Sequence, residues 1–176
     1  SHSGEDVLDA CLVDDGGFSH NRHALRIVEV LEQRYPDFPG LNLSMETLEG
    51  QQFRATKKDT AVSPSLEAQV VDAADSIAYD SHDADDALEL GLLDLSQLKE
   101  VSIWNTAVKK VSEGRDLSAN LLRRAVVHEL IDVQVKDLLD NTVAKIERLQ
   151  LQSAEQVRNQ PRIVGHSDHM AHEKND

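Results

Sequence analysis

The sequence predicts an all-α protein, on three observations. Apolar residues recur at helical spacing along several stretches, and no stretch alternates with the period of two that a half-buried strand would show. Only six residues are aromatic, so the core must be built mainly from Leu, Val, Ile and Ala, which favours helix packing. With 176 residues and no internal repeat, the chain is long enough for one sizeable core.

Short helices are expected in the first third of the chain. One should cover residues 4–13, where aspartates and glycines follow and stop it. Another should cover residues 21–35, with a proline just past its end. Ser44 is a suitable N-cap for a third helix, which should break near Gly50. Residues 51–63 are polar and basic and are expected to form a loop.

Two long helices are expected in the rest of the chain. The first should run over about 64–91, with a proline suitably placed in its first turn. The second is an amphipathic stretch over about 117–149. Shorter helices are expected within 94–101 and over 103–111, and a capping-box pattern at 153–156 begins a short last one.

The last residues look different from the rest. Residues 161–176 form a polar segment that we expect to be loop or disordered, outside a domain that covers residues 1–160. His166, His169 and His172 are evenly spaced in this segment and are expected to have no role.

The long helix expected over 64–91 carries an unusual polar stripe. Asp75, Tyr79 and Asp83 follow one another every four residues, and at about 100° per residue such a step returns to nearly the same side of a helix. Two carboxylates with a phenol between them therefore share one face of a helix otherwise rich in Ala, Val, Ile and Leu. This stripe either faces solvent or lines a polar pocket.

Composition excludes several classes of partner. A formal net charge of −14 argues against a nucleic-acid backbone or an anionic membrane as the main partner. The single cysteine, Cys11, excludes an intrachain disulfide framework and fits a reducing compartment. No apolar run approaches the length needed to cross a bilayer, and no signal peptide is visible, so we expect a cytoplasmic protein.

Several blocks, in preserved order, resemble the HD-superfamily deoxynucleoside triphosphate triphosphohydrolases, typified by the bacterial dGTPases. The most specific is Pro-Ser-Leu-Glu-Ala-Gln-Val-Val-Asp at 64–72, leading into Ala-Asp-Ser-Ile-Ala-Tyr at 74–79. Further blocks that resemble the family are His-Ser-Gly-Glu at 2–5, His-Asp-Ala-Asp-Asp at 82–86, and segments at 18–28, 40–43, 122–124 and 161–165.

This resemblance implies an HD-domain-like helical bundle and a metal-dependent hydrolase that cleaves a dNTP to deoxynucleoside and inorganic triphosphate. It implies that Asp75 is a ligand of a divalent metal ion such as Mg²⁺ or Mn²⁺. It also implies that Tyr79 packs against the deoxyribose and crowds the 2′ position, and that Asp83 accepts a hydrogen bond from the 3′-hydroxyl. His2 and Glu5 would support proton transfer, with the carboxylate orienting the imidazole, and His20 would contact the phosphates.

The family places three further metal ligands, a histidine and an adjacent His-Asp pair, before the position that matches His2. We therefore expect this chain to be an internal piece of a larger enzyme, incomplete at both ends, or a version trimmed at both ends. The alternatives are a catalytically inactive nucleotide-binding or oligomerisation module, and an HD-type phosphohydrolase acting on a nucleoside monophosphate or a cyclic nucleotide. The long amphipathic helices favour a homo-oligomer.

Overall fold

The structure is a computed structural model that describes residues 2–56 and 63–174, with the side chain of His2 outside the description. The described residues form α-helices α1 to α9, one 3-10 segment, one π-helical segment and no strand. The predicted all-α class is confirmed, and the arrangement is consistent with an HD-like helical bundle. No helix of the described part is both long and apolar enough to cross a membrane.

The chain divides into two compact units, each described by itself. The first contains residues 1–68 and 153–161, and the second contains residues 69–152 and 162–176. Each unit is therefore built from two separate stretches of sequence.

The first unit contains α1, α2, α3 and α8, which span His2–Cys11, His20–Arg26, Met45–Thr56 and Ala154–Arg158. The 3-10 segment Val13–Asp15 follows α1, and α2 continues into the π-helical segment Ile27–Leu31, so the helix expected over 21–35 ends earlier. Helices α2 and α3 pack together. Helix α8 is held by Arg158, whose guanidinium makes two ion-paired hydrogen bonds to the carboxylate of Glu49 on α3.

Helix α3 corrects the expectation of a break at Gly50 and of a loop directly after it. It continues through Gly50 to Thr56, because packing outweighs the cost of about 1 kcal/mol that a glycine brings to a helix interior. A Cβ atom added at Gly50 would lie 3.2 Å from the Cβ of Ala68, so the small residue permits a close approach there.

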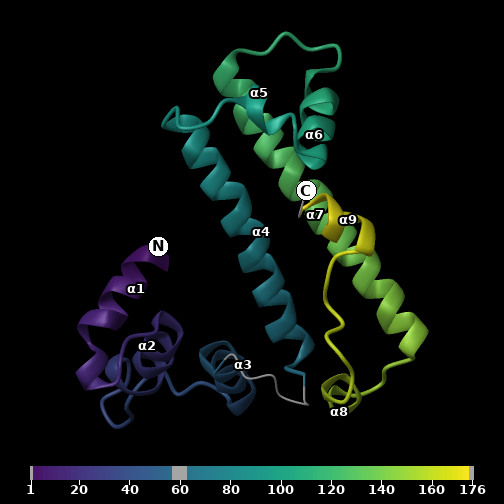
Figure 1. Ribbon diagram of the computed structural model, residues 1–176. Helices are drawn as coiled ribbons and strands as arrows, with labels where there is room; N and C mark the ends of the chain where they lie inside the picture. Colours follow the sequence, from purple (N-terminus) through teal and green to yellow (C-terminus); the bar gives the residue numbers. More distant parts are fainter. Residues whose placement is uncertain (1, 57–62, 175–176) are drawn as a thin grey trace. The chain divides into compact units, whose positions relative to one another are not determined.

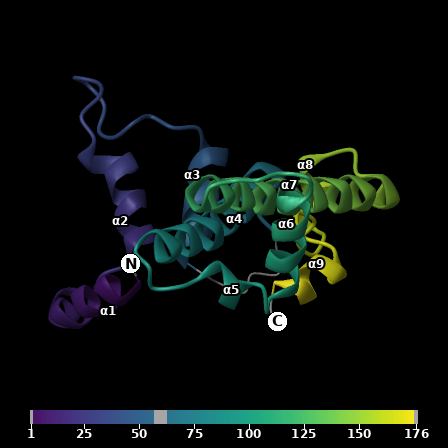
Figure 2. The same ribbon diagram turned by 90° about the horizontal axis from the view of Figure 1, so that it is seen from above.

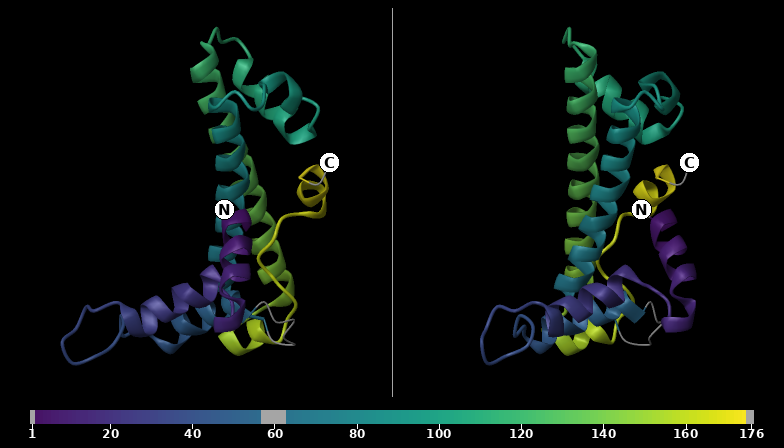
Figure 3. Two further views of the ribbon diagram at one scale, coloured as in Figure 1. Left: turned by 60° about the vertical axis from the view of Figure 1, so that its left-hand side comes forward. Right: turned by 90° about the vertical axis from the view of Figure 1, so that its left-hand side faces the viewer.

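The second unit is organised by α4 (Leu66–Glu89) and α7 (Ala119–Leu149), two long helices that run antiparallel (Figures 1 and 3). Helix α5 (Leu95–Leu98) begins with a capping box formed by Asp94 and Gln97. Helix α6 (Ser102–Ser112) packs on α7, on the same side of α7 as the C-terminal helix α9 (Figure 2). The core of this unit joins side chains from α6, α7 and α9: Ile103, Ala107, Val108, Val111, Val126, Leu130 and Met170.

The C-terminal segment corrects the expectation of a loose tail. Helix α9 forms over Asp168–Glu173, with Ser167 as its N-cap, and Met170 is buried. Ile163 and Val164 are each only 1% exposed, so the segment carries apolar side chains into the second unit.

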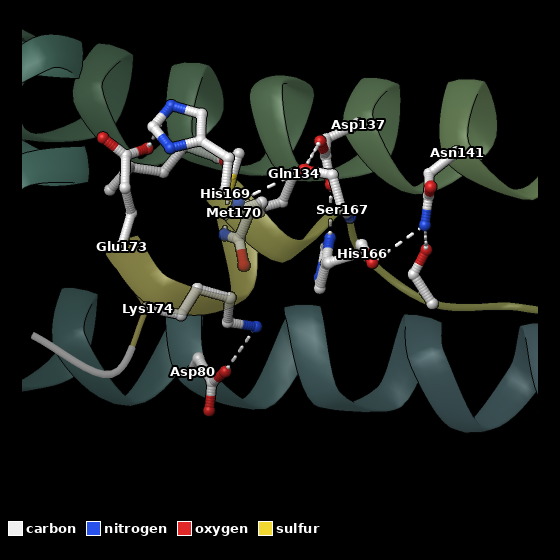
Figure 4. A network of polar contacts seen from close by, with 12 residues as sticks. Asp80, Gln134, Asp137, Asn141, His166, Ser167, His169, Met170, Glu173 and Lys174 are labelled. Carbon is white, nitrogen blue, oxygen red and sulfur yellow. Dashed lines mark hydrogen bonds and ion pairs between the residues drawn. The ribbon is translucent and has the colours of Figure 1, made fainter.

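Polar contacts fasten the same segment to the long helices. On α4, Gln69 Oε1 accepts hydrogen bonds from the backbone N–H groups of Ile163 and Val164, at 2.8 and 3.0 Å. On α7, Asp137 accepts hydrogen bonds from the backbone N–H and the hydroxyl of Ser167, at 2.9 and 2.6 Å (Figure 4). These polar contacts hold the segment in place together with its buried apolar side chains.

Candidate functional site

Helix α4 separates two kinds of side chain onto different faces. Gln69, Ala73, Ile77 and Ser81 repeat every four residues and are buried. Asp75, Tyr79 and Asp83 form the other stripe and are exposed, with Tyr79 at 51%. The predicted stripe therefore exists as a continuous polar face over more than two turns of helix.

Tyr79 and Asp83 interact within this stripe. The phenol hydroxyl of Tyr79 forms a hydrogen bond with the carboxylate of Asp83 one turn further along α4. This bond and the negative charge of Asp83 raise the pKa of Tyr79 above its ordinary value. The phenol is therefore neutral at physiological pH, and its hydroxyl is directed toward the carboxylate.

In the first unit, Glu5 on α1 and His20 at the start of α2 form a second pair. The imidazole Nδ1 of His20 lies 2.5 Å from one carboxylate oxygen of Glu5, and the backbone N–H of His20 donates to the other oxygen at 2.9 Å. Both oxygens of Glu5 thus contact one histidine residue. The carboxylate fixes the orientation of this imidazole, which is what a histidine that donates protons or binds an anion requires.

The structure thus brings Glu5 together with His20, and Tyr79 together with Asp83, while Asp75 lies one turn before Tyr79. His2 begins α1, and its side chain lies outside the described part. Glu5 and His20 belong to the first unit, and the other three residues belong to the second.

The Glu5–His20 contact was not predicted. The two residues are 15 apart in sequence, and no periodic pattern connects them. Local spacing in the sequence does not show that the turn between α1 and α2 brings these two residues together. The sequence showed only that His20 lies near the start of a helix.

A metal site is not formed by the residues that the structure describes. Within residues 2–56 and 63–174, no group of three or more His, Cys, Asp or Glu side chains is placed to hold a metal ion. Asp75 alone does not fit a resident divalent cation, which requires several oxygen or nitrogen ligands in one place.

Comparison with known proteins gives one consistent result. A deoxyguanosinetriphosphate triphosphohydrolase-like protein of Deinococcus deserti is 42% identical over 172 residues, which are 96% of this chain and 44% of that protein. Proteins described in the same words from Nitrosomonas europaea and a Caulobacter species are 38% and 40% identical over 95% and 90% of this chain. No family model matches the chain.

The chain spans about half the length of these curated relatives, at 44%, 48% and 46% of their residues. The resemblance is nevertheless spread over nearly all of the present sequence. The chain therefore matches, over almost its whole length, a part of the deoxyguanosinetriphosphate triphosphohydrolase-like proteins.

Proposed function

We propose that this chain is the central part of a dNTP triphosphohydrolase, an enzyme that converts a deoxynucleoside triphosphate to deoxynucleoside and inorganic triphosphate. The observation that carries the proposal is the exposed Asp75, Tyr79 and Asp83 stripe on α4, in a chain whose relatives are described as dGTPase-like. The names of the relatives support a hydrolase of this family, and a deoxynucleoside triphosphate is the substrate that we propose.

Each site residue has a role that suits its contacts. Tyr79 would present its ring to the deoxyribose, and the hydrogen bond to Asp83 would keep that ring in place. The carboxylate of Asp83 would accept a hydrogen bond from the 3′-hydroxyl of the sugar. His20, oriented by Glu5, would contact the triphosphate.

The proton transfer is assigned to His2 and Glu5. Glu5 is half-buried and its carboxylate orients the imidazole of His20. We propose that the same carboxylate orients the imidazole of His2. His2 is three residues before Glu5 on α1, a spacing that places neighbours on one face of a helix.

A divalent metal ion such as Mg²⁺ or Mn²⁺ belongs to the proposal, with Asp75 as one of its ligands. Within residues 2–56 and 63–174 no group of three candidate ligands is formed, so the remaining ligands would come from outside the described part. Further parts of the proposal are a cytoplasmic location and assembly into a homo-oligomer, for which the long amphipathic α7 offers a surface.

The direct test is the release of inorganic triphosphate from dGTP, dATP, dCTP and dTTP in the presence of Mn²⁺ or Mg²⁺, followed by ion chromatography, for this chain and for a longer protein that also carries the expected histidine and His-Asp ligands. We expect triphosphate and deoxynucleoside as the products of the longer protein. Asp75→Ala should lower the rate by about 100-fold, a loss of roughly 3 kcal/mol. Glu67→Ala removes another exposed carboxylate of α4, off the stripe, and should leave the rate unchanged.

Other outcomes distinguish the alternatives. If dGTP binds in equilibrium dialysis and no triphosphate is released, the chain is a nucleotide-binding module and not an enzyme by itself. Release of phosphate from a nucleoside monophosphate, or opening of a cyclic nucleotide, would instead point to another HD-type phosphohydrolase. An Asp75→Ala protein with full triphosphohydrolase activity would contradict the site assignment.

A further inference from the structure

The second unit contains a cavity that the proposed site does not use. It has a volume of about 400 Å³, within the usual range for sites that hold a small organic molecule. Its wall is formed by α4, by residues at the start of α6, by α7 and by Lys174 directly after α9, all within the second unit. The residues of α4 in this wall are Ser76, Asp80 and Ser81. None of them belongs to the stripe, although Ser76 and Asp80 each directly follow a stripe residue in the sequence.

Two buried polar side chains of this wall each carry an oxygen atom without a hydrogen-bond partner. Ser81 on α4 is 3% exposed and Gln134 on α7 is 4% exposed. The amide nitrogen of Gln134 donates to the backbone oxygen of Leu130 at 3.1 Å, but the amide oxygen Oε1 accepts no hydrogen bond. The hydroxyl of Ser81 takes part in no hydrogen bond. A buried polar atom without a partner costs about 1–3 kcal/mol, so such a pair in one cavity calls for a molecule that bonds to both.

The charges of the cavity are already paired with each other. Lys174 Nζ lies 3.0 Å from Asp80 Oδ2, and Figure 4 shows this ion pair bridging α4 and the end of α9. The two charges cancel, so neither a phosphate nor a cation finds an unopposed partner. The unpartnered groups inside are neutral, which favours a neutral ligand.

The rest of the wall is largely apolar and favours a flat ligand. Trp104 and Ile103, at the start of α6, and Leu130 on α7 supply apolar surface, and the indole of Trp104 is half-buried. A flat heterocycle would bury its face against such surface and place its polar edge toward Gln134 and Ser81. That edge needs an N–H to donate to Gln134 Oε1, next to a carbonyl or ring nitrogen that accepts from the Ser81 hydroxyl.

We propose that this cavity binds a nucleobase, as the free base or as part of a nucleoside, between α4, α6 and α7. The N–H next to a carbonyl or ring nitrogen that bases carry matches the acceptor of Gln134 and the hydroxyl of Ser81. None of the stripe residues Asp75, Tyr79 and Asp83 lines this cavity, so the inference does not depend on the proposed catalytic function.

Trp104 makes the test specific, since it is the single tryptophan of the chain. Thymine, guanine, thymidine and deoxyguanosine are titrated separately while the emission of Trp104 is followed with excitation at a wavelength that tyrosine does not absorb. We expect saturable quenching by the base, free or in the nucleoside. Deoxyribose and inorganic triphosphate are the negative controls, and comparison of base with nucleoside shows which form fits.

Three variants decide between a ligand site and a solvent-filled cavity. Gln134→Leu and Ser81→Ala each remove one proposed contact and should weaken base binding about tenfold or more. Thr142→Val is the matched control, because Thr142 on α7 is also buried with an unpartnered hydroxyl but is not part of the cavity wall. It should leave the dissociation constant unchanged.

The proposal is overturned if no base or nucleoside changes Trp104 emission at millimolar concentration. It is also overturned if all three variants bind the base with the dissociation constant of the unchanged protein. Asp75→Ala separates this inference from the proposed function, since that variant should lose triphosphohydrolase activity and keep the quenching of Trp104. Quenching that disappears in Asp75→Ala would place the base at the stripe and contradict a separate cavity.

Discussion

At Gly40 the backbone of the first unit returns close to the π-helical segment Ile27–Leu31. The φ of Gly40, +70°, lies in the left-handed region, and a Cβ atom added there would lie 2.3 Å from the backbone oxygen of Val28 and 2.4 Å from that of Glu29. The next residue, Leu41, donates its backbone N–H to the same Val28 oxygen at 2.8 Å. Only glycine allows the chain to return this closely to the π-helical segment.

Gly40→Ala should therefore lower the free energy of unfolding by about 3 kcal/mol or more, from the left-handed backbone and the clash together. Gly16→Ala is the matched control: Gly16 also has a left-handed φ of +92°, but no atom lies within 4 Å of its added Cβ. Its cost should be about 1 kcal/mol, from the backbone alone. Urea denaturation followed by circular dichroism measures both, and equal costs would show that the clash relaxes.

Tyr79 carries the prediction about sugar selectivity. If its ring crowds the 2′ position, Tyr79→Ala should raise the rate on GTP relative to dGTP by about tenfold, about 1.4 kcal/mol of lost discrimination. Tyr79→Phe keeps the ring and loses only the hydrogen bond to Asp83, so most of the discrimination should remain. The ratios of kcat/KM for the two nucleotides are the measurement, and an unchanged ratio in Tyr79→Ala would remove the tyrosine from the sugar site.

Asp137 and His166 make the second unit sensitive to acid. Burial, with the nearby charge of Lys174, lowers the pKa of His166, although its bond to Asp137 works in the opposite direction. Burial tends to raise the pKa of Asp137, but the hydrogen bonds from Ser167 and His166 outweigh it and lower that pKa. The histidine is thus held neutral and the carboxylate is held charged.

A histidine with a lowered pKa stabilises the fold fully above its unfolded pKa of about 6.5 and loses that contribution as the pH falls toward the folded pKa. The urea midpoint should therefore fall between pH 7.5 and 5.5, and less steeply in His166→Asn, which keeps a donor near Asp137 but does not titrate. His169→Asn, at an exposed position of α9, is the control. Equal slopes in His166→Asn and the unchanged protein would contradict this assignment. Asp137 adds a second loss at lower pH, below about 3.8.

At the scale of elements, the long helices could be predicted from the sequence, whereas the contacts between separate elements could not. Helices α4 and α7 have long apolar periodicity and clear ends, and both lie within two residues of their predicted bounds. At Gly50, by contrast, a local helix-breaking signal was outweighed by packing. The stripe on α4 followed from spacing alone, whereas the Glu5–His20 contact required the fold.

The C-terminal segment shows why composition can mislead. Its charged and polar residues predicted a tail, but Gln69, Asp137 and Asn141 on the long helices hold its backbone through hydrogen bonds. The bonding partners are dozens of residues away, so no local window contains the signal.

Gln69 on α4 accepts two hydrogen bonds from buried backbone N–H groups of this segment. Gln69→Leu would leave the buried N–H groups of Ile163 and Val164 without partners, and should cost about 2–5 kcal/mol. Gln134→Leu is the control, since that buried amide oxygen accepts no hydrogen bond, and its cost should be under about 1 kcal/mol. Thermal unfolding followed by circular dichroism compares them, and similar costs would mean that water replaces Gln69.

At the scale of the whole molecule, the last residues are part of the second unit and its stability should depend on them. Removing residues 162–176 exposes or deletes the buried contacts of Ile163, Val164 and Met170, roughly 5–9 kcal/mol of apolar burial. This is comparable with the total stability of a domain, so the second unit should unfold. Trp104 emission should shift to the red, and unchanged emission would contradict this dependence.

The division of each unit into two stretches also has a consequence for synthesis on the ribosome. The acceptor of Gln69 is matched to the N–H of Ile163, 94 residues later in the chain. At roughly 5–20 residues per second, α4 waits on the order of 5–20 s before the segment that completes its buried face has been translated. During that interval the side chain of Gln69 lacks the two N–H groups that it later accepts from, so this end of α4 reaches its final contacts only after residues 163 and 164 have been made.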